Sequence, residues 1–245
     1  MRIKNIIVTL WFNKFDNLKA MSETINENFK MYFPVCQFMA LPANMDPIIP
    51  RITGKSGSGH STFSMSTINA QITTNYDNNF NEDYDKCFEY IEERVKKLYE
   101  LLQNQRIDIL YSAIFVNLEK DSEKPIEMIN KSLINERLKN DNLNEIGMRM
   151  AIVEEDSFYK IIVVNNSKDY TMQREVKSGE NIILPLISLR DAKITKEYIS
   201  ISYELNDKYS FDNKDNYFNN IDIINKMFVK AKEDITSNIE ALIKE

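Results

Sequence analysis

The stretch KNIIVTLWF, Lys4–Phe12, decides how the fold begins. Its β-branched and aromatic residues are apolar at both alternating positions, which is typical of a central strand covered on both faces. A helix is predicted directly after it, from Leu18, because Met21, Ile25 and Phe29 recur at spacings of three and four residues. The chain therefore opens with a buried strand and an amphipathic helix.

Prolines and glycines divide the next sixty residues. Four prolines between positions 34 and 50 without any periodicity predict an extended connector that crosses the surface of a sheet. Strand character returns at Ile48–Thr53 and Thr62–Tyr76, on either side of the glycine- and serine-rich turn at 54–59. In the second stretch the apolar residues change parity near Ser66 and Thr67, so a bulge or a strand break is expected there.

The clearest helix of the chain lies between Tyr84 and Leu102, where seven residues form one apolar stripe. Packing of this stripe stabilises the helix, because each exposed Glu–Lys pair at a spacing of four contributes only about 0.2 to 0.5 kcal/mol. A strand at Ile107–Leu118 follows and completes a predicted β-α-β-β-α-β unit.

The second half of the chain reads as a helix, an antiparallel meander and a long closing helix. The first helix begins at Pro125, which suits a first helical turn. The closing helix starts near Tyr217. The meander strands are predicted at 146–153, 158–164, 172–176, 182–189 and 198–205. We therefore expect an α+β protein with an N-terminal unit, 1–120, and a C-terminal unit, 121–245, packed as one body because no linker separates them.

Composition excludes several classes of protein. The net charge of −6 has the wrong sign for a general nucleic-acid binder, so nucleic acid is an unlikely partner. No apolar run is long enough to span a membrane and no secretory leader is visible, which predicts a cytoplasmic protein. Cys36 and Cys87 form no CxxC pair, and His60 is the only histidine. The usual metal and Cys/His catalytic sets are absent, so we expect no cofactor and no metal.

A local positive patch stands out in this acidic chain. Residues 47–76 contain no Asp or Glu, whereas Arg51, Lys55 and His60 lie among serines and threonines that include Ser56 and Ser58. If residues 54–61 form an exposed turn, these five residues could capture a phosphate, a terminal carboxylate or an acidic partner segment. A solvated hairpin tip without a partner explains the same residues. A P-loop is excluded because Ile49 stands where its first glycine is needed.

The closing helix carries a row of apolar residues spaced by seven: Ile221, Phe228, Ile235 and Leu242. Such a row is typical of a coiled-coil seam and predicts a homodimer through this helix. A helix that packs on its own sheet also needs an apolar stripe. Both interpretations are consistent with the sequence.

The order of the parts resembles a known family. The relevant features are the Ile49-Pro50-Arg51 triplet, the glycine and serine turn, the strand Ser64–Asn69, a helix with Tyr84, and a closing strand at Ile199–Tyr203 before the terminal helix. They are similar to an uncharacterised family of prokaryotic proteins of about this length, found sporadically in bacteria and archaea. The resemblance implies an α+β fold and a patchy distribution linked to mobile elements, and it supplies no catalytic residue.

Two functions follow as hypotheses. The first is a non-enzymatic binding protein that recognises a protein or peptide partner, in a phage-defence or mobile-element locus by analogy with the family. The second is an enzyme or sensor for a phosphorylated small molecule that uses residues 51–61.

Overall fold

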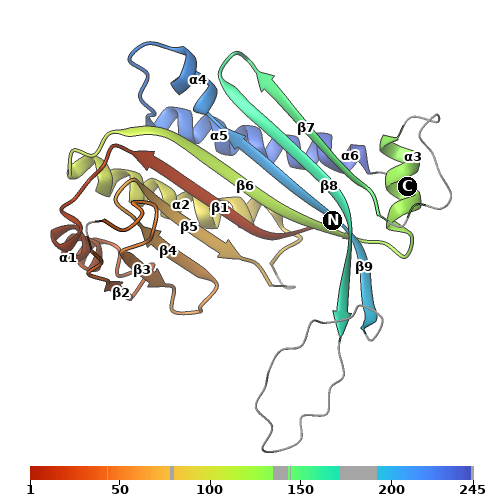
Figure 1. The fold of residues 1–245 in the computed structure, drawn as a ribbon, viewed down its shortest axis with the longest axis horizontal. Helices are drawn as coiled ribbons and strands as arrows, with labels where there is room; N and C mark the ends of the chain where they lie inside the picture. The colour runs from red at the N-terminus through yellow and green to blue at the C-terminus, as the bar shows by residue number, and fades with distance from the viewer. Residues whose placement is uncertain (43, 78–79, 135–142, 144, 172–191, 244–245) are drawn as a thin grey trace, which may run out of the picture.

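The structure is a computed structural model that describes residues 1–42, 44–77, 80–134, 143, 145–171 and 192–243. In this part of the chain, nine strands form one antiparallel sheet in the order β2-β3-β4-β5-β1-β6-β9-β8-β7 (Figure 1). The strands are β1 (Arg2–Phe12), β2 (Val35–Phe38), β3 (Ile52–Lys55), β4 (Ser61–Met65), β5 (Asn69–Asn75), β6 (Ile109–Asp121), β7 (Gly147–Glu154), β8 (Phe158–Thr171) and β9 (Lys193–Asn206). The fold class is α+β, as predicted.

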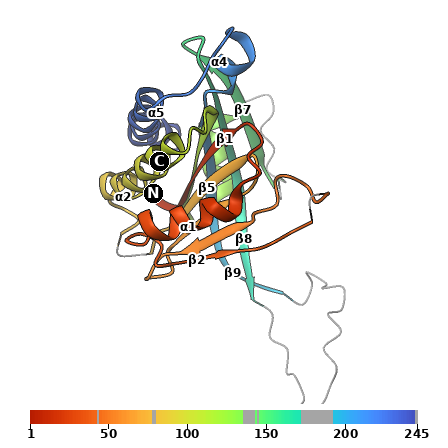
Figure 2. The same ribbon diagram turned by 90° about the vertical axis from the view of Figure 1, so that its left-hand side faces the viewer.

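The long helices cover one face of this sheet. The helices are α1 (Leu18–Asn28), α2 (Tyr84–Asn104), α3 (Pro125–Leu133), α4 (Lys208–Asn213) and α5 (Ile221–Glu233), which continues through a π-helical turn (Asp234–Ile239) into α6 (Glu240–Leu242). Figure 2 shows α2 and α5 side by side on one side of the sheet, and the two helices contact each other. The opposite side of the sheet, here called the open face, carries none of the long helices among the described residues.

Alternation along the strands builds the core. Ile6, Val8 and Leu10 of β1 are buried under the helices, together with Ile114 and Val116 of β6. The intervening residues point to the open face; Ile7 and Phe115 are partly exposed, whereas Thr9 is buried. The prediction that the first strand is covered on both faces is therefore wrong, because helices pack on one face only.

The N-terminal unit holds two more strands than predicted. Residues 62–76 divide into β4 and β5, and the break expected near Ser66 and Thr67 is confirmed by a turn in which the Ser66 N–H donates to the Asn69 carbonyl at 2.8 Å. The connector after Pro34 contains β2, which pairs with β3 at the edge of the sheet and does not cross its surface. The order is β-α-β-β-β-β-α-β.

In the second half, the predicted helix from Pro125 and the strands β7, β8 and β9 are confirmed. The strands predicted at 172–176 and 182–189 lie outside the described residues. The closing helix begins at Ile221 rather than near Tyr217, and the short helix α4 precedes it. Because β6 pairs with β9, strands from both halves of the chain lie next to each other in one sheet.

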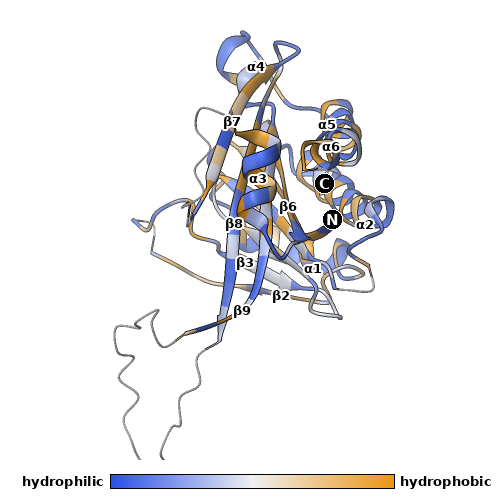
Figure 3. Cartoon of the chain, turned by 90° about the vertical axis from the view of Figure 1, so that its right-hand side faces the viewer, coloured by the Kyte–Doolittle hydropathy of each residue, from blue (hydrophilic) through white to orange (hydrophobic). Residues whose placement is uncertain are grey.

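The strands β8 and β9 run past the ends of their neighbours as a two-stranded arm (Figure 1). The pairing extends to Thr171 and Lys193. Figure 3 shows that this arm is mostly hydrophilic, in contrast to the parts of the same strands under the helices. The arm therefore adds nothing to the buried core.

A buried ionic cluster anchors the β7–β8 hairpin to the closing helix. The Lys160 Nζ lies 2.7 Å from a Glu154 oxygen and 3.2 Å from Asp234 Oδ2. Tyr203 donates a hydrogen bond of 2.8 Å to the same Asp234 oxygen. Burial raises the pKa of the Tyr203 hydroxyl, so that it keeps its proton. Asp234 is the first residue of the π-helical turn, which places its carboxylate among these groups.

Candidate binding surfaces

The five residues predicted to bind an anion do not form one site. Arg51 precedes β3 and Lys55 is its last residue, so four residues of extended strand separate their Cα atoms by roughly 13 Å. Arg51 is buried and donates a hydrogen bond of 2.8 Å to the Ile49 carbonyl. It stabilises the start of β3, so Arg51 is engaged within its own chain and lies apart from the turn with which it was predicted to bind an anion.

The turn is shorter than predicted. Gly57, Ser58, Gly59 and His60 are exposed between β3 and β4, and Gly59 has a φ of +78°. Gly54, by contrast, is a buried residue of β3: a Cβ built on it would lie 2.6 Å from the Cys36 Sγ. Its lack of a side chain serves strand packing, not the turn.

Lys55 and Ser56 line a cavity of about 730 Å³ at the corner formed by β2, β3 and β4. The lining also contains the hydroxyl groups of Thr53, Thr62 and Ser64, and it contains no carboxylate. We call this the corner cavity. Its single cation and its hydroxyl donors keep the anion hypothesis open for these two residues alone.

Ser58 and His60 line a second cavity, of about 310 Å³, on the other side of the same turn. Its wall is formed by the aromatic side chains of Tyr76, Phe80 and Tyr90. Ser58 and His60 are close to Lys55 in sequence, but they lie in a different chemical environment. The predicted patch therefore combined residues of two separate cavities.

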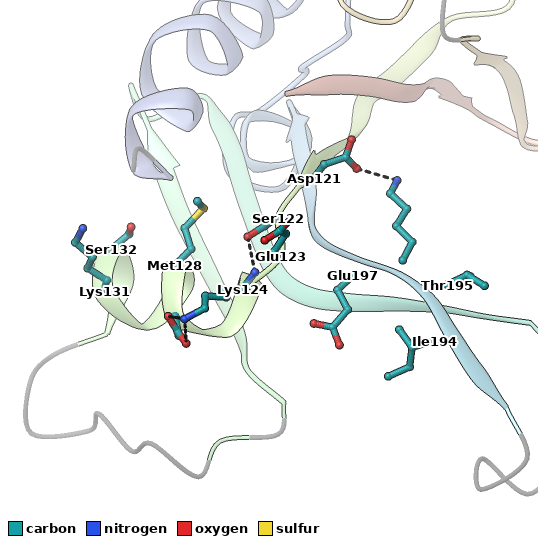
Figure 4. Close-up of a pocket in the computed structure, with 12 residues that line it drawn as sticks. Asp121, Ser122, Glu123, Lys124, Met128, Lys131, Ser132, Ile194, Thr195 and Glu197 are labelled. Carbon is teal, nitrogen blue, oxygen red and sulfur yellow. Dashed lines mark hydrogen bonds and ion pairs between the residues drawn. The ribbon is translucent and has the colours of Figure 1, made fainter.

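A cavity of about 980 Å³ lies between α3 with its preceding loop and the start of β9 (Figure 4). Four of its charged residues form two ion pairs: Lys196 lies 3.0 Å from Asp121, and Lys124 lies 2.9 Å from Glu127. Most of these side chains are exposed. The lining carries charges of both signs, four acidic and three basic residues, so this cleft shows no clear preference for a cation or an anion.

The described residues contain no group of three or more His, Cys, Asp or Glu side chains that could hold a metal ion. Cys87 is a buried residue of α2, as predicted, and burial raises the pKa of its thiol to about 12. Burial also raises the pKa of the Cys36 thiol. Both cysteines therefore keep their protons at neutral pH and are poor nucleophiles.

The centre of the open face is polar and hydrogen-bonded within itself. Asn117 donates to Asn5 at 2.8 Å and accepts from Ser202 at 2.7 Å. Asn206 donates to Glu204 at 2.6 Å. These side chains satisfy each other across β1, β6 and β9, which fits a solvated sheet surface.

The strand β7 forms one edge of the sheet (Figure 1). None of its eight residues is buried, and Ile152 and Val153 are 43% and 45% exposed. Among the described residues, no strand pairs with its outer side. An exposed edge of this length can pair with another extended chain.

The main chain of β7 presents every second residue to the outside. The Asn166 N–H donates to the Ile146 carbonyl at 3.1 Å, just before β7 begins. In an antiparallel pair the hydrogen-bonded residues alternate, so the even-numbered residues of β7 bond to β8. The odd-numbered residues then direct their N–H and C=O groups away from β8; these are Gly147, Arg149, Ala151 and Val153.

The other edge strand, β2, is short and partly covered. The Met39 N–H donates to the Arg51 carbonyl, so Cys36 and Phe38 direct their main-chain groups away from β3 by the same alternation. The Cys36 N–H donates to Asn26 Oδ1 of α1 at 3.2 Å. Phe38 is therefore the one residue of β2 whose N–H points outward without a described partner.

The predicted dimer row of the closing helix lies largely in the chain's own core. Phe228 is 2% exposed and packs edge-to-face on Phe88 of α2, with ring centroids 6.4 Å apart. Ile235 is fully buried, and Ile221 and Leu242 are partly buried. The row serves intramolecular packing, which is the alternative that the sequence left open, and a homodimer through this helix stays a prediction.

No protein-family model matches this chain, and no curated protein matches it either. No helix within the described ranges is both long and apolar enough to cross a membrane. The choice of a functional surface therefore rests on the geometry of the edges and cavities.

Proposed function

We propose that this chain is a non-enzymatic binding protein that recognises an extended segment of another protein by adding it as a tenth strand next to β7. The observation that carries the proposal is an eight-residue edge strand with no buried residue. Strand addition gives affinity through main-chain hydrogen bonds and specificity through alternate side chains.

The edge lacks the features that normally prevent unwanted pairing. Natural edges are protected by prolines, lysines, bulges or very short strands. The sequence of β7, GMRMAIVE, has no proline or lysine, and its pairing with β8 has no register shift. An unprotected edge of this kind is expected in a protein whose edge strand binds a partner.

The side chains of β7 indicate the chemistry of that partner. Met150, Ile152 and Val153 offer apolar contacts, and Arg149 is the one cation of the strand. A segment that alternates apolar residues with a carboxylate opposite Arg149 would fit. A second copy fits less well, because pairing centred on Met150 would bring the two Arg149 side chains to diagonal positions about 7 to 8 Å apart.

An unbiased peptide selection tests this proposal. A library of random ten-residue peptides would be selected against the full chain, and the selected peptides would be tested for binding to two variants. Ala151→Pro removes one outward N–H and leaves every β7–β8 hydrogen bond in place. Ala151→Ser is the matched control, because it keeps that N–H. We expect apolar, acidic peptides whose binding is lost in Ala151→Pro and retained in Ala151→Ser.

Hydrogen exchange on the same complexes locates the binding site. A bound strand should slow the exchange of the outward amides of Arg149, Ala151 and Val153. Selected peptides that bind Ala151→Pro as tightly as the wild type would contradict the proposal. A dimer of the free chain that Ala151→Pro converts to monomer would also contradict it, because the edge would then serve a second copy.

A second candidate function is binding of a phosphorylated small molecule in the corner cavity. Lys55 and the surrounding hydroxyl groups support it. Inorganic phosphate should raise the melting temperature of the wild type. Lys55→Ala should abolish the rise, while Lys19→Ala, at an exposed position of α1, should retain it. An unchanged melting temperature in the wild type would exclude this candidate.

The cellular setting stays a prediction. A cytoplasmic location is consistent with two free cysteines. The phage-defence or mobile-element locus rests on the family resemblance, and the genes next to this one would test it.

A further inference from the structure

The aromatic cavity beside the β3–β4 turn has the composition of a small-molecule site. It measures about 310 Å³ and lies between the turn, the end of β5 and α2. Three aromatic side chains form its wall, and polar groups surround them: Ser58, His60, Thr74, Asn75 and Asp77. Ligand sites combine an apolar, aromatic wall with a few polar groups in this way.

Two of the three rings are stacked, and the third stands nearly perpendicular to both. Tyr76 and Phe80 are nearly parallel, with ring planes 14° apart and centroids 5.8 Å apart. Tyr90 stands at 77° to Tyr76 and at 76° to Phe80. A flat ring in such a cavity can stack on one wall while it presents its edge to another, which are the two arrangements that aromatic pairs prefer.

Hydrogen bonds hold the two tyrosine rings before any ligand binds. Tyr76 donates to the Cys87 carbonyl in the first turn of α2 at 2.6 Å. The Ser61 hydroxyl donates to the Tyr90 oxygen at 3.4 Å, which leaves the Tyr90 proton available to an acceptor on a ligand. The wall is thus preorganised, and a ligand does not have to order it.

The cavity has charged groups of both signs close to it: Asp77 is part of the lining, where its Oδ2 lies 3.9 Å from His60 Nε2, and Arg94 lies against the Tyr90 ring. At the Tyr90 wall, Arg94 favours a neutral ligand over a cation. The guanidinium carbon of Arg94 lies 3.4 Å from the centroid of the Tyr90 ring, and Arg94 also donates to the Tyr90 carbonyl at 2.6 Å. This cation already uses the electrostatic attraction of the Tyr90 ring and would repel a second positive charge next to it. Aromatic cages for ammonium groups lack such a competitor.

We infer that this cavity binds a small, neutral, planar aromatic molecule that stacks against Tyr76, Phe80 or Tyr90 and accepts a hydrogen bond from the Tyr90 hydroxyl or a group of the rim. The inference does not depend on the proposed partner at β7, which lies at the opposite edge of the sheet. It assigns a different role to His60, which was predicted to bind an anion.

The single histidine of the chain makes the test direct, because its ring protons are identified in a proton NMR spectrum without assignment. Indole is the probe. A ring that binds beside His60 shifts these resonances, and we expect a saturable shift with a dissociation constant at or below about 1 mM, the range of fragment-sized ligands. Phe80→Ala, which removes one wall, should weaken binding at least tenfold.

Three controls decide between outcomes. Tyr209→Ala removes an aromatic residue of α4 far from the cavity and should bind indole like the wild type. Ser58→Phe places a bulky side chain on the exposed turn and should block the cavity. This variant tests the inference independently if Phe80→Ala fails to fold. A shift that grows linearly with indole, or that is equal in Ser58→Phe, would overturn the inference. Saturation by tetramethylammonium but not by indole would overturn the assignment to a neutral ring.

Discussion

The two edge strands of the sheet, β2 and β7, differ in length and in how the rest of the chain covers them. The β2 edge has four residues, and α1 supplies the Asn26 side chain to one of its outward amides. The β7 edge has eight residues, and no described strand pairs with its outer side. The same sheet thus ends in one edge closed by its own chain and one edge left open.

This difference in length and cover indicates that β2 is protected against pairing with other chains, whereas β7 is available for it. Short, covered edges prevent unspecific pairing, and β2 meets that description. The β7 edge is long and apolar and carries one arginine, so aggregation would be expected unless a specific partner covers it. The predictions below address first how each edge is held in place, and then whether β7 is open.

The largest effect is expected at the ionic cluster below the β7–β8 hairpin. Asp234→Ala removes the partner of both Lys160 and Tyr203 and leaves a buried ammonium group with one carboxylate. Breaking a buried pair in this way costs roughly 3 to 5 kcal/mol. Denaturant unfolding should show a loss of about 3 kcal/mol. Glu233→Ala, one residue earlier and exposed, is the control and should change stability little.

An equal loss of stability in Asp234→Ala and Glu233→Ala would contradict this prediction. It would show that the closing helix does not anchor β8 and that strand pairing alone holds the open edge in place.

A smaller effect is expected at the closed edge. In Gly54→Ala the new methyl group would overlap the Cys36 Sγ and crowd Phe33, so β2 must shift. Overpacking of this kind costs about 1 to 3 kcal/mol. Gly57→Ala, where no atom lies within 4 Å of the new methyl group, should be nearly neutral. The double variant Gly54→Ala/Cys36→Ala should recover part of the loss in thermal unfolding; no recovery would show that β2 is not held by this contact.

The smallest effect links the open face to Arg149 through pH. Burial raises the pKa of Glu204, and the charge of Arg149 opposes that rise. The folded state therefore keeps the Glu204 proton to higher pH than the unfolded state does. Stability then falls as pH rises from about 4.5, the unperturbed pKa, through the folded value.

Glu204→Gln removes this contribution. Relative to the wild type, the free energy of unfolding of Glu204→Gln should rise with pH above about 4.5 and then level off. Arg149→Ala should deepen the fall in the wild-type background and have no such effect in Glu204→Gln. Parallel pH profiles for all of these chains would disprove the coupling between β7 and the open face.

Much of the fold follows from local patterns. The apolar stripe of α2 was predicted from seven residues with helical spacing, and six of these seven residues are buried. The parity change near Ser66 predicted the break between β4 and β5. In both cases the pattern that predicts the structure lies within a short stretch of the sequence.

Non-local pairing explains what was missed. The four residues of β2 stand between prolines without alternation, and only pairing with β3 defines them as a strand. Gly54 was assigned to a turn, whereas the position of Cys36 on the neighbouring strand requires it.

The candidate sites show the same limit. Arg51, Lys55 and His60 are close in sequence, but an intervening strand and a turn direct them to three different environments. The seven-residue spacing of Phe228 and Ile235 could not distinguish packing on α2 from packing on a second chain. The open edge had no sequence signal, because a strand becomes an edge only through the order of the whole sheet.

Residue-resolved amide exchange of the free chain tests the central claim most directly. The account predicts fast exchange at Arg149, Ala151 and Val153, whose amides point away from β8, and slow exchange at Met148, Met150 and Ile152. At the β2 edge only Phe38 should exchange fast, because Cys36 is bonded to Asn26. Uniform protection along β7 would contradict the account, since it would show that the edge is already paired in the free chain.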